Sequence, residues 1–263
     1  MKKSEDKNLN EYSDIFSKVY NLYWSDFIDE IGPSLIEIAN ELFHNNPHVK
    51  TKHMLDLCCG SGRLATKFLE NQFNITGIDL SPHMISIANK NNIDYVNDDK
   101  AEFIVHDVIN YKLDKKFLLI TSTFDSLNHM KNIDEFTQVI KNVYRDLLPD
   151  GIFIFDLNTE KGLKSWEFVD FEETDDLVMI FHGKYDRKEK VAYSKVYGFL
   201  TEDNVSWRRF DQLMTNTVFN ISEIELILRK IGFKEIWITD DKNLFVKIDN
   251  PEEKDRIFIF ARK

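Results

Sequence analysis

From residue 53 onward, short apolar runs alternate with segments of helical pattern, and this alternation restricts the fold more than any other feature. The apolar runs are residues 53–58, 74–79, 102–106, 116–122 and 151–157, and the helical segments between them lie near 62–71, 82–90 and 133–147. A helix between two strands lets the second strand lie parallel to the first. The pattern therefore predicts an α/β fold with a mostly parallel sheet and helices on both faces.

A further helix and two strands close the chain. Ile221–Ile231 has a helical pattern that Gly232 can end, and strands are expected at Lys234–Thr239 and Arg256–Ala261. With these two strands the predicted sheet has seven strands.

Before the alternation begins, residues 12–43 carry apolar residues every three to four positions, which predicts helix. The pair Gly32-Pro33 interrupts this segment, and we expect it to divide the segment into two helices.

A second departure lies at residues 160–218, where the alternation stops. Leu177–Tyr185, Val191–Leu200 and Val205–Val218 read as longer strands joined by polar turns. They predict an antiparallel β cap inserted before the last helix. Three domains are expected. They are N-terminal helices at 1–52 that cover a ligand site of the sheet, an α/β domain at 53–159 and 219–263, and the cap at 160–218.

The charge and cysteine content narrow the classes of partner. The 263 residues carry a net charge of −11, and an acidic surface repels a phosphate backbone, so no nucleic-acid partner is expected. The start of the chain is polar and no apolar run approaches the roughly 18 residues of a membrane span. Two adjacent cysteines fit a reducing cytoplasm. The histidines show no metal-ligand spacing, so no metal is expected.

A glycine-rich stretch follows the first strand of the alternating region. Gly60-Ser-Gly62 opens a helix, and glycines there let the backbone turn tightly and approach a ligand. Asp79 ends the next strand, where a carboxylate can bind ribose hydroxyls, and Asp107 ends the third, where it can meet an adenine amino group. The alternatives are an ordinary tight turn at the glycines, a helix-terminal charge at Asp79 and a solvated loop acid at Asp107.

Asp56 helps to choose between nucleotide cofactors. It lies inside an otherwise apolar strand, where a carboxylate is costly unless it is hydrogen-bonded or meets a cation. The Asp56 carboxylate would repel an anionic pyrophosphate, whereas it would attract a sulfonium cofactor with an amino group. Asp56 therefore favours S-adenosylmethionine over NAD, with a purely structural acid as the alternative.

These motifs together resemble the ordered motifs of the class I S-adenosylmethionine-dependent methyltransferases. The matching stretches are Leu55-Asp-Leu-Cys-Cys-Gly-Ser-Gly62, Gly77-Ile-Asp79, His106-Asp107 and Leu148-Pro-Asp-Gly-Ile-Phe-Ile-Phe155. The resemblance implies a Rossmann-like sheet and S-adenosyl-L-methionine as the cofactor. The residues it implies for the cofactor are Asp56, Cys58, Gly60, Gly62, Asp79, Leu80, Asp107, Val108 and, from the N-terminal segment, Tyr20. Cys58 stands where the family usually has its first glycine.

A narrower resemblance concerns the acceptor. Residues 11–22 and 124–130 are similar to segments of small-molecule N-methyltransferases, including the amino-sugar N,N-dimethyltransferases. In that group, residues matching Tyr12 and His129 face the methyl-transfer site, which implies catalytic roles for both. The inserted strands match the group's substrate cap in position, but Gln212-Leu-Met214 stands where the group tends to have Glu-x-His.

The sequence thus predicts methyl transfer to a small-molecule acceptor, with nitrogen as the favoured atom. Such a transfer mainly requires that a nucleophile be held in line and water be excluded. His129 would take a proton or only orient the acceptor. O- or C-methylation, an NAD-dependent oxidoreductase and a cofactor-binding accessory protein without turnover remain as alternatives, and the chain is expected to be a monomer or a homodimer.

Overall fold

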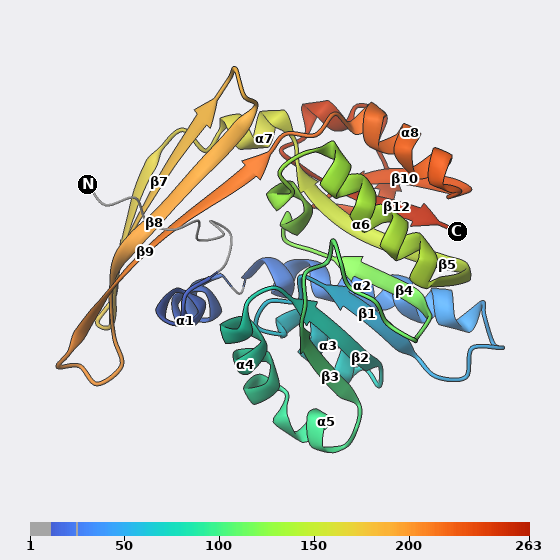
Figure 1. Ribbon diagram of the computed structural model, residues 1–263, viewed down its shortest axis with the longest axis horizontal. Coiled ribbons are helices and arrows are strands. Elements are labelled where there is room, and N and C mark those ends of the chain that lie inside the picture. Colours follow the sequence, from blue (N-terminus) through green and yellow to red (C-terminus); the bar gives the residue numbers. More distant parts are fainter. Residues whose placement is uncertain (1–11, 25) are drawn as a thin grey trace.

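The computed structural model describes residues 12–24 and 26–263, which form two β-sheets with helices around the larger one (Figure 1). The larger sheet has eight strands in the order β11-β10-β12-β5-β4-β1-β2-β3. Its strands are β1 (His53–Leu57), β2 (Asn74–Asp79), β3 (Ala101–Val105), β4 (Phe117–Ser122), β5 (Leu147–Asn158), β10 (Glu235–Asp240), β11 (Asn243–Lys247) and β12 (Arg256–Arg262). Strands β1 to β5 pair in parallel, and β12 and β10 pair antiparallel.

Four helices of the larger unit lie close to the predicted positions, and a short helix at Ile93–Asn97 was not predicted. The five helices are α3 (Arg63–Glu70), α4 (Pro82–Asn91), α5 (Ile93–Asn97), α6 (Ile133–Asp146) and α8 (Ile221–Ile231), together with short 3₁₀ turns at Ser126–His129 (η1) and Pro251–Glu253 (η2). Helix α4 begins at the Ser81 cap, whose hydroxyl accepts the N–H of Met84, and Pro82 occupies the first turn. Gly232 ends α8 with a φ of +126°.

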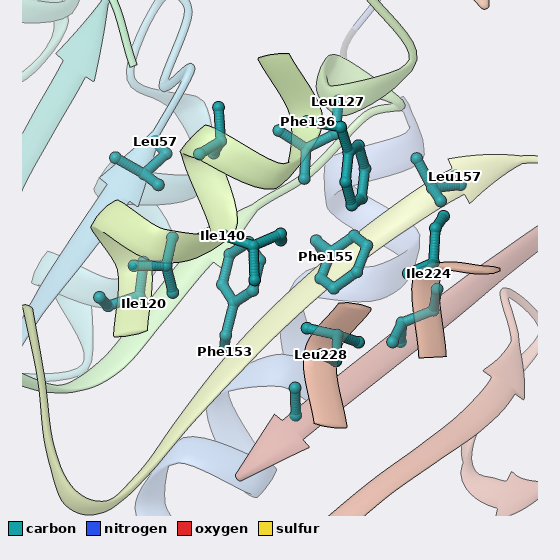
Figure 2. Packing of buried hydrophobic residues seen from close by; sticks show 14 of the residues in the cluster. Leu57, Ile120, Leu127, Phe136, Ile140, Phe153, Phe155, Leu157, Ile224 and Leu228 are labelled. Atoms are coloured by element: carbon teal, nitrogen blue, oxygen red, sulfur yellow. The ribbon is translucent and has the colours of Figure 1, made fainter. Parts of the chain in front are cut away.

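An apolar core fixes α6 and α8 against the sheet (Figure 2). Phe153 and Phe155 of β5 are fully buried, and Phe155 meets Phe136 of α6 with ring centroids 6.0 Å apart. Leu228 of α8 belongs to the same cluster. Each such side chain contributes about 1.5–3 kcal/mol on burial. This packing holds the carboxyl ends of β1, β2 and β4 at one edge of the sheet. Because β1 lies between β2 and β4, a crevice opens there, where open α/β sheets bind ligands.

The predicted sheet is correct in class but one strand short. Strand β11 lies between the two predicted C-terminal strands, where no strand was expected, and pairs with β10 at the edge of the sheet. The backbone N–H groups of Lys242 and Asn243 both donate to Asp240, which closes a tight hairpin. Phe245 and Val246 are about half exposed, so this edge strand lacks the buried pattern by which a strand is recognised.

The expected helix break at Gly32-Pro33 is wrong. The first two helices are α1 (Asp14–Tyr23) and α2 (Asp26–His44), and Pro33 lies inside α2. Gly32 has no Cβ to clash with the proline ring, so the chain stays helical before the proline. The buried apolar face of α2, which includes Ile31 and Leu35, offsets the lost hydrogen bond.

The second sheet has the order β6-β7-β8-β9 and is antiparallel throughout. Its strands are β6 (Val169–Glu173), β7 (Leu177–Asp186), β8 (Val191–Thr201) and β9 (Trp207–Thr217), and α7 (Glu160–Lys164) precedes them. Strand β6 was not predicted because its sequence, Val-Asp-Phe-Glu-Glu, is polar and exposed. Helix α1 lies between this sheet and α4 (Figure 1). Phe16 and Val19 of α1 pack on the apolar face of the sheet. None of the described helices is long and apolar enough to cross a membrane.

Candidate active site

The loop between β1 and α3 is built on left-handed backbone conformations. Cys58, Gly60 and Gly62 have φ values of +56°, +53° and +75°. A Cβ on Gly60 would meet nothing within 4 Å, so the loop backbone at this position faces open space. A Cβ on Gly62 would lie 3.0 Å from the Cβ of Ala88, so this glycine lets α3 approach α4. The two glycines therefore serve different purposes, one toward a ligand and one toward packing.

Asp79 fixes the loop from the neighbouring strand. Its Oδ2 accepts the N–H of Gly60 and its Oδ1 accepts the N–H of Ser81, both at 2.9 Å. Burial raises the pKa of Asp79 above its ordinary value, and the two N–H donors oppose that rise. Asp107, beyond β3, accepts the N–H of Ile109 at 2.8 Å. The carboxylates are thus held by backbone groups at adjacent strand ends.

A cavity of about 340 Å³ lies in front of this loop. Its walls include nine of the predicted site residues, namely Tyr12, Tyr20, Cys58, Gly60, Asp79, Leu80, Asp107, Val108 and His129. Residues far apart in the chain therefore meet here. Gly62 and Asp56 do not line this cavity.

Asp56 is buried in β1, behind the loop. The hydroxyl of Thr121 on β4 donates to its Oδ1 at 2.8 Å. Burial raises the pKa of Asp56 to about 7, with the charge of Asp79 adding to the rise and the Thr121 bond opposing it. The structure therefore gives Asp56 a side-chain partner within the sheet, and its expected role toward the cofactor stays a prediction.

A second cavity of about 330 Å³ lies between α1, β6, β7 and the turn after β4. Aromatic side chains form most of its wall. Tyr12, Tyr20, Phe124 and His129 line both this cavity and the first. The two cavities therefore adjoin at these four side chains.

His129 ends the η1 turn and is oriented from β9. Its Nδ1 lies 2.8 Å from the carbonyl oxygen of Thr215, so Nδ1 must carry the proton that is donated. In the neutral ring the lone pair is then on Nε2. Asn128 anchors the same turn, because its side-chain N–H groups donate to the carbonyls of Asn158 and Thr217 at 3.1 and 2.9 Å.

Tyr12 and Tyr20 form an aromatic wall at the junction of the cavities. Their ring centroids are 5.4 Å apart, and Tyr20 meets Phe124 edge-on at 6.0 Å. Burial raises the pKa of both phenols, with nearby carboxylates adding to the rise, so both stay protonated at neutral pH. The hydroxyl of Ser81 donates to the Tyr12 carbonyl at 3.2 Å, which ties this wall to α4.

A buried charge cluster beneath the second cavity was not predicted from the sequence. Arg256 contacts Asp125 at 2.8 Å and also pairs with Asp156, and Asn216 donates to Asp125 at 2.8 Å. Phe124 and Asp125 both have positive φ, +65° and +48°, so the cluster holds a strained turn. One signal was available: Asp156, like Asp56, is an acid inside an apolar strand.

The residues around the first cavity fit S-adenosylmethionine. Asp79 and Asp107 offer acceptors for hydroxyl and amino groups, the open backbone at Gly60 permits close approach, and the faces of Tyr12 and Tyr20 suit a sulfonium cation. The described residues contain no group of three or more side chains able to hold a metal ion.

Comparison with known proteins agrees with this geometry. Residues 54–151 match the model of a methyltransferase domain. YqeM of Bacillus subtilis is 26% identical over 212 residues, which is 80% of this chain and 83% of that protein. A dTDP-3-amino-3,4,6-trideoxy-alpha-D-glucopyranose N,N-dimethyltransferase of Streptomyces venezuelae is 21% identical over 88% of this chain and 96% of its own. The crystal structure of an S-adenosylmethionine-dependent methyltransferase from Clostridium acetobutylicum superposes with a TM-score of 0.79 at 21% identity, covering 95% of this chain and 98% of that one.

These likenesses confirm the resemblance drawn from the sequence. Residues 54–151 therefore form a methyltransferase domain, and the fold of the chain is that of an S-adenosylmethionine-dependent methyltransferase.

Proposed function

We propose that this enzyme methylates a small-molecule acceptor at nitrogen. One observation carries the proposal: the two cavities adjoin at Tyr12, Tyr20, Phe124 and His129. A cofactor in the first cavity and an acceptor in the second would face each other across these side chains.

In this proposal the residues of the first cavity hold the cofactor. The backbone at Gly60, the carboxylates of Asp79 and Asp107, and the apolar contacts of Leu80 and Val108 bind it. When bound, the cofactor supplies an electrophilic methyl group. Asp56 stays in the proposal as a buried acid behind the loop, and Gly62 as the residue that lets α3 pack closely.

His129 acts as the proton acceptor. As the nitrogen of the acceptor forms its new bond to carbon it loses a proton, and Nε2 of His129 takes that proton because Nδ1 is committed to Thr215. Tyr12, which stays neutral, orients the acceptor nitrogen, and the surrounding rings exclude water. The Streptomyces venezuelae relative is named for dimethylation at nitrogen, which supports nitrogen over oxygen or carbon. The predicted division into covering helices, α/β domain and substrate cap is part of the same proposal.

A thermal-shift measurement tests the cofactor half of the proposal. S-adenosylhomocysteine at 100 times its Kd should stabilise the protein by about 2.7 kcal/mol. NADH at the same concentration serves as the control and should leave the melting temperature unchanged. Stabilisation by NADH alone would instead favour an oxidoreductase.

An acceptor screen that follows release of S-adenosylhomocysteine tests the catalytic half. Amines should be turned over, and matched alcohols with the same carbon framework should not. Cofactor binding without turnover of any amine, alcohol or heterocycle would favour an accessory protein.

A further inference from the structure

The second cavity has an aromatic wall with rings from three parts of the chain. Trp24 follows α1, Trp166 follows α7, and Phe181 lies on β7. Trp166 meets Phe181 edge-on at 6.3 Å, and Phe168 stacks on Phe181 at 5.2 Å. Such walls suit a flat apolar molecule, because rings gain contact area and favourable stacking or edge-on geometry.

The charges of this wall are negative or already neutralised. Among the described lining residues the one lysine or arginine is Arg256, which is 14% exposed and pairs with Asp125 and Asp156. Asp170 and Glu172 of β6 add two further carboxylates to the wall. The cavity therefore offers an anion no described cation that is not already paired.

A neutral donor completes the lining. The hydroxyl of Ser194 is buried, lines the cavity and has no hydrogen-bond partner among the described residues. Its partner across the β8–β9 pair is Met214, whose thioether is a weak acceptor. A buried hydroxyl of this kind favours a ligand with an uncharged polar group.

From this wall, and resting on the proposed function, we propose that the acceptor is an arylalkyl amine without phosphate groups. A phosphate carries nearly two negative charges and needs charge-assisted partners when it leaves water. Here it would meet Asp170 and Glu172 and no uncommitted cation among the described lining residues. An amine gains instead from the carboxylates and the ring faces. The nucleotide-linked sugar in the name of the Streptomyces venezuelae relative belongs to the class that this wall disfavours.

Glu172 also closes one side of the cavity. The phenol of Tyr23 at the end of α1 donates to the Glu172 carboxylate on β6, which links the N-terminal helix to the edge strand. Glu172 is therefore both a wall charge and a contact that positions α1, whereas its neighbour Glu173 does not line the cavity.

The test compares tyramine with tyramine O-phosphate, which differ only in the phosphate. Because Trp24 and Trp166 line the cavity, tryptophan fluorescence of the full-length enzyme saturated with S-adenosylhomocysteine reports binding without turnover. We expect tyramine to quench with a Kd at least about 10-fold lower than its phosphate, since the carboxylates of Asp170 and Glu172 oppose the latter. Equal or tighter binding of the phosphate, or no quenching by tyramine and related arylalkyl amines at millimolar concentration, would overturn the proposal.

Two charge reversals on β6 sharpen the test. Glu172→Lys should reduce the preference for tyramine at least about 3-fold, because it places a cation in the wall. Glu173→Lys, the same charge change one residue away and outside the lining, should leave the preference within about 2-fold. Equal effects of both variants would show that overall charge rather than this wall sets the preference, and would also overturn the proposal.

The test of this inference and the test of the proposed function can fail separately. Faster methylation of a phosphate-bearing amine than of its phosphate-free partner would remove this inference and leave N-methylation standing. Tight binding of tyramine without methylation of any amine would remove the proposed function and leave only the preference of the second cavity for an amine without phosphate.

Discussion

At the scale of single residues, Cys58 occupies a conformation that glycine adopts more readily. Its φ of +56° lies in the left-handed region, which costs an ordinary residue about 1–2 kcal/mol. Burial and the charges of Asp79 and Asp56 raise the pKa of the thiol, so it stays protonated and is a poor nucleophile. Cys58 therefore serves the shape of the loop rather than redox chemistry.

Substitution of Cys58 separates shape from chemistry. Cys58→Val should lower the free energy of unfolding by about 2 kcal/mol, because a β-branched side chain fits the left-handed region poorly. Cys58→Gly should stay within about 1 kcal/mol of the parent protein. Urea denaturation measures both values, and a valine variant as stable as the parent would contradict the assigned strain.

His129 is the residue whose loss should separate catalysis from binding. His129→Asn removes the Nε2 base and should lower kcat about 100-fold. The Kd for S-adenosylhomocysteine should change less than about 3-fold, since that contact is one of many in the first cavity. His44→Asn, at the exposed end of α2, is the matched control. Wild-type kcat in the His129 variant would refute the base role.

At the scale of elements, the segment between α7 and β6 is held against β7 by a close backbone contact. The N–H of Gly183 donates to the Phe168 carbonyl at 2.9 Å, and a Cβ on Gly183 would overlap the carbonyl oxygen of Trp166. Because Trp166 and Phe168 both line the second cavity, a glycine on β7 sets the position of its wall.

Gly183→Ala should therefore disturb the second cavity and leave the first cavity unchanged. We expect a loss of about 2 kcal/mol in stability and a KM for the acceptor about 10-fold higher. The affinity for S-adenosylhomocysteine should stay the same. Lys184→Ala, the exposed neighbour on the same strand, is the control, and equal kinetics in both variants would show that the contact is dispensable.

At the scale of the whole molecule, two buried acids couple stability to pH. Burial raises the pKa of Asp56 to about 7 and that of Asp156 to about 6, the latter opposed by Arg256. In the unfolded chain both would titrate near 3.8. Between these values the folded state binds more protons than the unfolded state, so stability falls as the pH rises.

The free energy of unfolding should accordingly decline from about pH 4 to about pH 7 through these two groups. Asp56→Asn keeps an acceptor for Thr121 and removes the charge, so it should be more stable than the parent at pH 8, on the order of 2 kcal/mol. The advantage should disappear near pH 4. Denaturation curves at several pH values measure this, and a constant difference between the proteins would contradict it.

Much of the α/β fold could be predicted from the sequence, because apolar alternation and helix caps are local signals. The parallel strands, α4 with its Ser81 cap and α8 with Gly232 lie within a few residues of their expected bounds. Strands β6 and β11 could not be predicted in this way, since edge strands are exposed and lack the buried pattern. The helix through Pro33 was also not predicted, because the local sequence indicates a helix break that tertiary packing overrides.

The candidate site likewise has features that local sequence predicts and features that it does not. The glycine loop and the acids Asp79 and Asp107 could be found from local sequence, because the end of each strand is marked by neighbouring residues. Three contacts depend on the folded chain: Thr121 donates to Asp56, Thr215 orients His129 across 86 residues, and Arg256 pairs with Asp125 across 131. Such contacts depend on how distant elements pack, and no local pattern of polarity encodes which elements will meet.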